Sequence, residues 1–162
     1  MSPTRGAVYS LDTSGLIDGL ERYYPPSVFP GLWERVDQLI AGGRLWLSEE
    51  VVEEACKKDL AAKEWCDARD KTRFMVPTDT DIADVVKGIL AEFPKLVKEM
   101  KARNRADAFV IAVAITKDAA VVTGEGQDGS DDRPKIPYIC RKRQVDCLRL
   151  VDLIKREGWT FT

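Results

Sequence analysis

The sequence contains no histidine among its 162 residues, so a very common general base and metal ligand is missing. Ser-His-Asp triads and histidine-ligated zinc sites are therefore excluded. Four cysteines are present, but no two of them form a C-x-x-C pair, so we expect reduced thiols and no cysteine zinc site. Carboxylates, hydroxyls, lysines and arginines remain as the groups that could carry out chemistry.

Long apolar runs and an excess of positive charge are also missing. The formal net charge of −2 at pH 7 gives no sign of a broad nucleic-acid surface, although it leaves a local basic patch open. No apolar segment approaches the roughly 18–20 residues of a membrane span, and no apolar signal core follows residues 1–6. We therefore expect a cytoplasmic protein that does not enter a membrane. The length and the 44% hydrophobic content predict a single domain, residues 1–162.

Short apolar segments alternate with helical patterns along the chain. The segments predicted as strands are 7–11, 45–47, 74–76, 119–123 and 145–148. Helical periodicity separates them, and Pro94 should interrupt the clearest amphipathic helix. Strands that alternate with helices indicate a parallel sheet, so we predict a three-layer α/β/α fold with a central parallel sheet of about five strands.

The most unusual helix is predicted at residues 106–115, where every residue except Asp107 is apolar. A helix that is apolar on all sides belongs inside the domain. A carboxylate carried toward a core costs several kcal/mol unless a cation or hydrogen-bond donors compensate for it. Asp107 could instead simply complement the positive end of its helix, and this stretch alone does not decide between the two interpretations.

Other carboxylates should lie near Asp107. Asp12 follows the first predicted strand, and Glu125 follows the fourth, between two glycines. The carboxyl ends of parallel strands share one edge of the sheet, although Asp12 could equally cap the next helix. A helix that opens with EEVVEE adds Glu53 or Glu54, and its periodicity does not choose between them. Clustered carboxylates repel one another unless a divalent cation such as Mg²⁺ or Mn²⁺ neutralises them.

A basic run precedes the apolar helix and consists of Lys95, Lys98, Lys101, Arg103 and Arg105. Such a run is usually a solvated face. Because it adjoins Asp107, it is also the best local candidate for contacts with substrate phosphates. We expect Lys101 and Arg105 to make such contacts.

At these residues the chain resembles the PIN-domain family of metal-dependent ribonucleases, which includes the VapC-type toxins of toxin–antitoxin pairs. The matching segments are LDTSG at 11–15, VVEEA at 51–55, ADAFVIAVA at 106–114 and VVTGE at 121–125. Residues 136–159 resemble the ending of a poorly characterised PIN-like branch. The similarity therefore extends over nearly the whole chain.

The resemblance implies a cleavage site for RNA phosphodiesters with Mg²⁺ or Mn²⁺ as the cofactor. The implied catalytic residues are Asp12, Glu54, Asp107 and Glu125. Of these, Asp12, Asp107 and Glu125 would hold the metal, and Ser14 would support Asp12. The family's spacing from Val51 assigns the helical acid to Glu54. An RNA substrate is implied, and for a toxin also an antitoxin protein.

Several alternatives stay open at this stage. Many relatives have Asp where this chain has Glu125, so the last ligand could come from the following loop, at Asp128, Asp131 or Asp132. A haloacid-dehalogenase phosphatase would need an acid where Ser14 stands, and a response-regulator receiver would carry its aspartate in mid-chain. A non-catalytic RNA-binding or protein-interaction module and a different metal-dependent phosphohydrolase also remain. The sequence leaves open the RNA target, the number of metal ions and the oligomeric state, including a homodimer.

Overall fold

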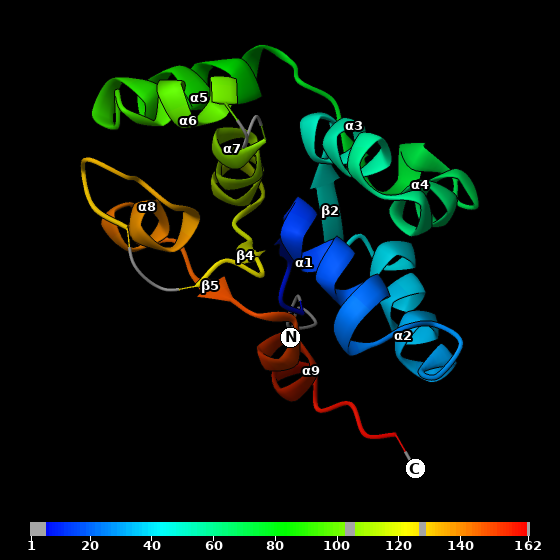
Figure 1. Cartoon of the computed structure of the whole chain (residues 1–162). Coiled ribbons are helices and arrows are strands. Elements are labelled where there is room, and N and C mark those ends of the chain that lie inside the picture. Colours follow the sequence, from blue (N-terminus) through cyan, green and yellow to red (C-terminus); the bar gives the residue numbers. More distant parts are fainter. Residues whose placement is uncertain (1–5, 103–105, 127–128, 162) are drawn as a thin grey trace, which may run out of the picture.

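The computed structural model describes residues 6–102, 106–126 and 129–161 (Figure 1). Its centre is one parallel sheet with the strand order β3-β2-β1-β4-β5. The strands are β1 (Tyr9–Leu11), β2 (Leu45–Ser48), β3 (Met75–Val76), β4 (Ala120–Val122) and β5 (Cys147–Leu148). The predicted parallel sheet of five strands is confirmed; four strands are shorter than the sequence pattern indicated, and β2 is one residue longer.

Helices cover both faces of the sheet, which makes the three-layer α/β/α fold that the sequence predicts. The helices before β3 are α1 (Thr13–Asp18), the π-helical turn η1 (Gly19–Tyr23), α2 (Pro30–Ala41), α3 (Glu49–Lys58), α4 (Leu60–Asp67) and the 3-10 turn η2 (Lys71–Arg73). Those after β3 are α5 (Thr80–Glu92), α6 (Leu96–Ala102), α7 (Asp107–Lys117), α8 (Ile136–Lys142) and α9 (Leu150–Glu157). Figure 1 shows α5 to α8 on one side of the molecule and α2 to α4 on the other.

Local sequence signals explain where several helices begin and end. Ser48 caps α3, because its Oγ accepts a hydrogen bond from the Val51 backbone N–H over 3.0 Å. Pro94 separates α5 from α6, as expected for a residue that cannot continue a helix. Gly158 ends α9 with a φ of 70°, a conformation that favours glycine. Every described helix is too short or too polar to span a lipid bilayer.

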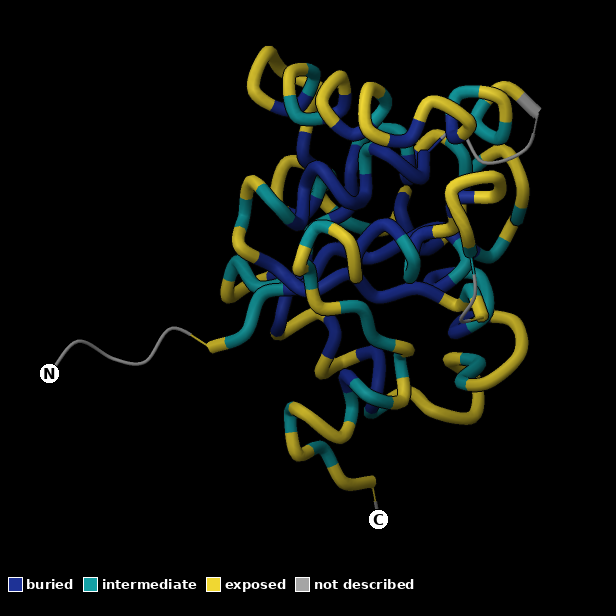
Figure 2. The backbone as a smooth tube through the Cα atoms, turned by 90° about the vertical axis from the view of Figure 1, so that its left-hand side faces the viewer, coloured by how far each residue is buried: buried dark blue, intermediate teal, exposed yellow. Residues whose placement is uncertain are grey.

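Helix α7 lies at the centre of the domain and packs against β1, β2 and β4. Its residues Ala108, Val110 and Ile111 are fully buried, and buried backbone fills the middle of the molecule in Figure 2. The Ser10 hydroxyl ties α7 to the sheet by donating to the Val110 carbonyl over 2.8 Å. The predicted interior helix is therefore confirmed, and its first residue is Asp107.

A polar network surrounds the beginning of β1. The Glu157 carboxylate accepts hydrogen bonds from the Tyr9 hydroxyl over 2.5 Å and from Arg44 Nη2 over 2.6 Å. Tyr9 is fully buried, so its hydroxyl depends on this partner. All four cysteines, Cys56, Cys66, Cys140 and Cys147, are free thiols, as expected.

The strand register decides which side chains can meet. Leu11 lies opposite Val122, and Val122 lies opposite Leu148, so β1, β4 and β5 end level with one another. The residues that directly follow these three strands, Asp12, Thr123 and Arg149, therefore share one edge of the sheet.

Candidate active site

Four carboxylates from four elements interact at the carboxyl edge of the sheet. Asp12 follows β1, Glu125 follows β4, Glu54 lies in α3 and Asp107 begins α7. The charges of Asp12, Glu125 and Glu54, in that order, raise the pKa of Asp107. The structure thus places all four acids that the sequence singled out within range of one another's charge.

Asp12 is almost completely buried, at 3% exposure, and two hydroxyls hold one of its oxygens. Its Oδ2 accepts hydrogen bonds from Ser14 Oγ over 2.7 Å and from Thr123 Oγ1 over 2.9 Å. Burial raises the pKa of Asp12 and these hydrogen bonds lower it, with a net upward shift. Although Asp12 precedes α1, its side chain makes no capping hydrogen bond with the described residues there, so it does not act as an ordinary helix cap.

The two hydroxyls belong to a longer chain of hydrogen bonds. Ser14 Oγ and Thr123 Oγ1 lie 3.1 Å apart, and each also accepts a backbone N–H from the segment after β4. Gly124 donates to Ser14 over 2.9 Å, and Glu125 donates to Thr123 over 3.1 Å. Sequence reasoning predicted that Ser14 supports Asp12 but missed Thr123, whose only signal is its position directly after a buried strand.

Glu54, rather than its neighbour Glu53, faces the other acids. Its side chain is only 12% exposed, and Oε2 accepts the backbone N–H of Ala106 over 3.2 Å, at the start of α7. Its other oxygen, Oε1, pairs with Lys58 Nζ over 3.2 Å. Glu53 is exposed on the outer face of α3. Helical periodicity left open whether Glu53 or Glu54 faces the other acids, and the contact with Ala106 shows that it is Glu54.

Asp107 has the most strongly perturbed carboxyl group of the site. It is 4% exposed, and no hydrogen bond or ion pair to its carboxylate is found within residues 6–102, 106–126 and 129–161. Burial and the nearby charges of Asp12, Glu125 and Glu54 raise its pKa to about 9, against a small lowering by Lys58. A site of this kind favours protonation or a bound cation.

Glu125 lies in the segment after β4 and is the fourth acid of the candidate site. Its Oε2 accepts the backbone N–H of Ile136 over 3.0 Å, at the start of α8. Burial, followed by repulsion from Asp12, raises the pKa of Glu125. These contacts leave Glu125 half-buried and turned toward the other acids.

The loop acids that were alternatives to Glu125 have other partners. Asp131 is exposed and accepts a hydrogen bond from the Tyr138 hydroxyl over 2.8 Å. Asp132 is also exposed and pairs with Lys95. Asp128 lies outside the described residues. Of the acids after β4 that the structure describes, Glu125 is thus the one coupled to Asp12.

The donor atoms suit a hard divalent cation, because all of them are carboxylate oxygens. As they stand, however, no three His, Cys, Asp or Glu side chains in the described part of the chain are close enough to enclose a metal ion. Mg²⁺ is commonly bound through one or two carboxylates, with water and substrate oxygens at the remaining positions. The donor set fits an ion held in that open way, but not an ion enclosed by protein ligands alone.

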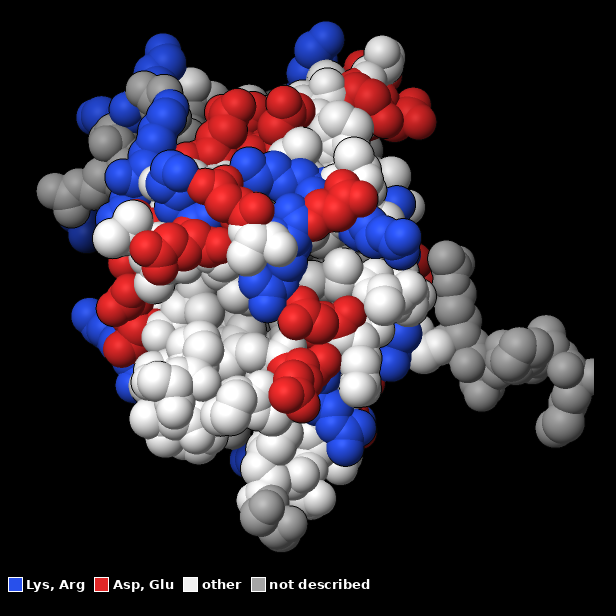
Figure 3. Space-filling model, turned by 90° about the vertical axis from the view of Figure 1, so that its right-hand side faces the viewer, with Lys and Arg blue, Asp and Glu red and all other residues white. Residues whose placement is uncertain are grey.

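The basic run before α7 is described only in part. Lys101 is exposed on α6 and lines a hollow of about 360 Å³ together with Glu50 and Phe109. Arg105, the second predicted phosphate contact, lies outside the described residues. Figure 3 shows Lys and Arg side chains interspersed with Asp and Glu over the upper part of the face it displays, and much of the lower part is uncharged. Any phosphate-binding surface on that face is therefore local.

Comparison with curated proteins gave no significant match. Residues 9–161, which include every acid of the candidate site, match a family described as a domain of unknown function, DUF4411. The match extends from the first residue of β1 to beyond α9. The chain therefore belongs to the DUF4411 family.

Proposed function

We propose that this protein is a Mg²⁺- or Mn²⁺-dependent endoribonuclease that hydrolyses RNA phosphodiesters at Asp12, Glu54, Asp107 and Glu125. The observation that carries the proposal is the environment of Asp107. Its carboxylate is buried beside three other carboxylates, and its pKa is raised to about 9. Several like charges held together at low exposure are costly for the fold unless a cation neutralises them.

Each residue of the site would have its own role in the reaction. Asp12, Asp107 and Glu125 would hold the cation, directly or through water. The hydrogen bonds from Ser14 and Thr123 keep Asp12 in one orientation, so that its position does not have to be organised at each turnover. When bound, a divalent cation polarises the phosphodiester and lowers the pKa of water.

Glu54 would accept a proton or a hydrogen bond from the attacking water. Its carboxylate is fixed by the Ala106 N–H on one oxygen and by Lys58 on the other. Lys58 also contributes positive charge near Asp107, which lowers the pKa of that carboxyl group. These contacts favour a stationary carboxylate over a mobile surface side chain.

The resemblance to PIN-domain ribonucleases supports the same assignment, and it extends the proposal to an RNA substrate. If the protein acts as the toxin of a toxin–antitoxin pair, an antitoxin protein would be its partner, and the protein would act in the cytoplasm. The rival functions are a non-catalytic binding module and a phosphatase acting on small phosphomonoesters.

A cleavage assay separates these functions. A mixed RNA pool is incubated with the protein in Mn²⁺, in Mg²⁺ and in EDTA, and a small phosphomonoester is tested in parallel. We expect RNA fragments with either metal, none in EDTA, and no turnover of the phosphomonoester. Equal cleavage in EDTA would contradict the metal requirement. RNA that is bound but never cut would assign a binding module, and turnover of the phosphomonoester alone would assign a phosphatase.

A further inference from the structure

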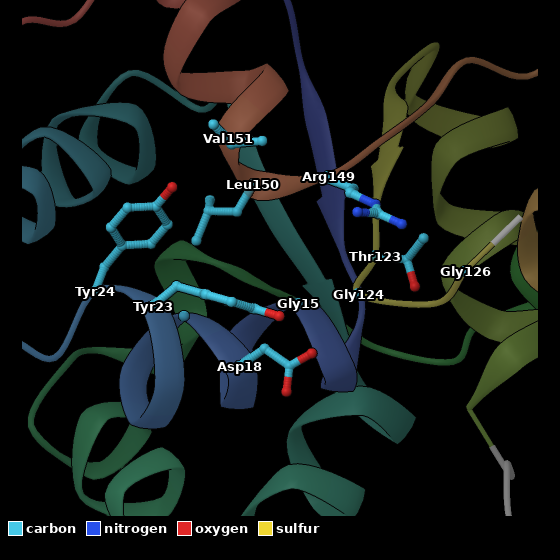
Figure 4. Close-up of a pocket in the computed structure, with 11 residues that line it drawn as sticks. Gly15, Asp18, Tyr23, Tyr24, Thr123, Gly124, Gly126, Arg149, Leu150 and Val151 are labelled. Carbon is cyan, nitrogen blue, oxygen red and sulfur yellow. The ribbon is translucent and has the colours of Figure 1, made fainter.

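A pocket of about 370 Å³ opens directly beside the acidic site (Figure 4). One wall is the segment after β4, which includes Thr123 and Gly124, and the opposite wall is formed by Tyr23 and Tyr24. Thr123 is the residue whose hydroxyl donates to Asp12, so its side chain links the pocket to one of the proposed catalytic carboxylates. A ligand in this pocket would therefore lie next to the residue that holds Asp12.

The tyrosine wall is held in place by the backbone of the π-helical turn. The Tyr24 N–H donates to the Gly19 carbonyl over 2.9 Å, and the Tyr24 carbonyl accepts the indole N–H of Trp33 over 2.6 Å. The Tyr24 ring packs edge-on against Phe29, with 5.5 Å between ring centroids. Tyr23 is 61% exposed and reaches across the pocket in Figure 4. The Tyr23 ring lies against the held Tyr24 ring, with 6.4 Å between the ring centroids, and an exposed aromatic ring in this position is suited to stacking on a base.

Arg149 provides a cation at the side of the pocket nearest the acids. It directly follows β5, and it is placed next to Thr123 because the Thr123 N–H donates to the Leu148 carbonyl over 2.9 Å. Its guanidinium lies near the Thr123 side chain in Figure 4. None of the salt bridges between described residues involves Arg149. It is therefore placed to bind a phosphate between the pocket and the acids.

Asp18 is the polar group that can distinguish one base from another. Its side chain is 26% exposed, and among the described residues it pairs with Arg22, whose Nε lies 3.9 Å away on a side chain that is 72% exposed. Asp18 Oδ2 also lies against Gly124, where even an added Cβ would overlap with it. The carboxylate thus lies at the pocket, close to the Gly124 backbone, and is only weakly paired.

The chemistry of a carboxylate limits which base it can recognise. An ionised carboxylate only accepts hydrogen bonds, so it pairs best with a base edge that offers two adjacent donors. The Watson–Crick edge of guanine offers N1–H and N2–H₂ side by side. Adenine and cytosine offer one amino group next to an acceptor nitrogen, and uracil offers one N–H between two carbonyl oxygens. Asp18 therefore favours guanine.

We propose that this pocket binds a guanine base of single-stranded RNA adjacent to the cleaved phosphodiester. Tyr23 stacks on the base, Asp18 accepts hydrogen bonds from its Watson–Crick edge, and Arg149 binds the phosphate that links it to the acidic site. This inference rests on the proposed function and adds its substrate class, single-stranded RNA that is cut next to a guanosine.

Binding without cleavage tests the inference. Fluorescein-labelled strands of ten nucleotides, all uridine except for one central G, A, C or U, are titrated with the protein in EDTA, and anisotropy is recorded. We expect the G strand to bind roughly tenfold tighter than the U strand, the range of one bidentate base contact. Asp18→Asn should abolish this preference, because an amide presents a donor where guanine needs an acceptor.

Variants of Tyr23 test the stacking contact of the tyrosine wall. Tyr23→Ala should weaken binding of all four strands by roughly tenfold, the contribution of one stacked base, whereas Tyr23→Phe should keep it. Leu60→Ala is the matched control, because Leu60 is 69% exposed on α4 and does not line the pocket. It should leave every affinity unchanged.

The outcomes separate this inference from the proposed function. Equal affinity for the four strands, with metal-dependent cleavage intact, would overturn the guanine pocket and leave the nuclease standing. A guanine preference in EDTA without cleavage in Mn²⁺ would remove the nuclease and leave the pocket. A change in gel-filtration elution by Tyr23→Ala, with RNA affinity unaltered, would assign the surface to contacts between copies of this chain and overturn the pocket.

Discussion

Replacing Asp107 with Asn should stabilise the metal-free protein, because it removes a carboxyl group from a site that disfavours its charge while keeping the shape of the side chain. The pKa of Asp107 rises from 3.8 to about 9 on folding. At pH 7 the unfolded chain therefore carries an ionised Asp107 and the folded chain a protonated one. Each pH unit between the unfolded pKa of 3.8 and pH 7 lowers the free energy of unfolding by about 1.36 kcal/mol. At pH 7 Asp107 therefore destabilises the metal-free fold by roughly 4 kcal/mol.

The pH dependence gives the sign of this effect. Below the unfolded pKa of 3.8 both states are protonated, so Asp107 costs no stability there. The cost grows as the pH rises from about 4 toward the folded pKa of about 9 and is constant above it. The stability difference between Asp107→Asn and wild type should widen over the same interval. As the pH rises from about 4 to about 9, the melting temperature of the metal-free wild-type protein should therefore fall further and further below that of the variant.

Thermal melts with and without Mn²⁺ provide the assay. Wild type should gain about 2.7 kcal/mol when free Mn²⁺ is a hundredfold above its dissociation constant, and Asp107→Asn should lose most of this gain together with its nuclease activity. If Asp107 only complements its helix, the variant should instead be less stable by about 0.3–1 kcal/mol, whether metal is present or not. A variant destabilised equally in Mn²⁺ and EDTA, with cleavage intact, would show that Asp107 complements its helix and does not bind a metal.

Three further predictions concern other parts of the molecule. Replacing Lys101 and Arg105 with Ala should weaken RNA binding for all sequences and flatten its salt dependence, and an unchanged salt slope in anisotropy titrations would make this run an ordinary solvated face. Ser14→Ala and Thr123→Val should each lower cleavage without changing the secondary structure seen by circular dichroism, because each removes one donor from the same buried carboxylate; a rate equal to wild type for both would contradict the supporting role. Glu157→Gln should lower the free energy of unfolding by about 1–3 kcal/mol, because it weakens the partner of a buried tyrosine hydroxyl and an arginine; urea melts that coincide with those of wild type would contradict this.

The fold was predictable because its signals are local and repeated. Apolar segments that alternate with helical periodicity specify a parallel sheet, and the all-apolar pattern after Asp107 identifies the interior helix. Strand ends were less predictable, since a strand extends only as far as a partner backbone pairs with it. The segment 145–148 is paired as a strand only at Cys147–Leu148.

The candidate site was predictable where it depends on topology. Parallel strands end at one edge, so the alternation of strands and helices is enough to expect that Asp12 and Glu125 meet. Glu54 was not resolved by periodicity, because one helical turn presents it and Glu53 at similar angles, and its contact with Ala106 depends on how two helices pack. The pocket was missed entirely. It depends on a π-helical turn that brings Tyr23 opposite Thr123, and the sequence pattern of a short helix does not reveal that turn.

We propose that this acidic cluster cleaves RNA with a bound divalent cation, and a comparison of two variants with wild type is the decisive experiment. Single-turnover cleavage of one RNA in Mn²⁺ is measured for wild type, Asp12→Asn and Asp131→Asn. Asp131 is the matched control, because it is an exposed acid of the segment after β4 whose carboxylate bonds to Tyr138. We expect Asp12→Asn to lose cleavage by roughly a hundredfold or more, since loss of an outer partner of a metal site already costs about 10–100-fold, while Asp131→Asn should cleave like wild type. Cleavage by Asp12→Asn at the wild-type rate would mean that these acids do not form a metal-dependent active site.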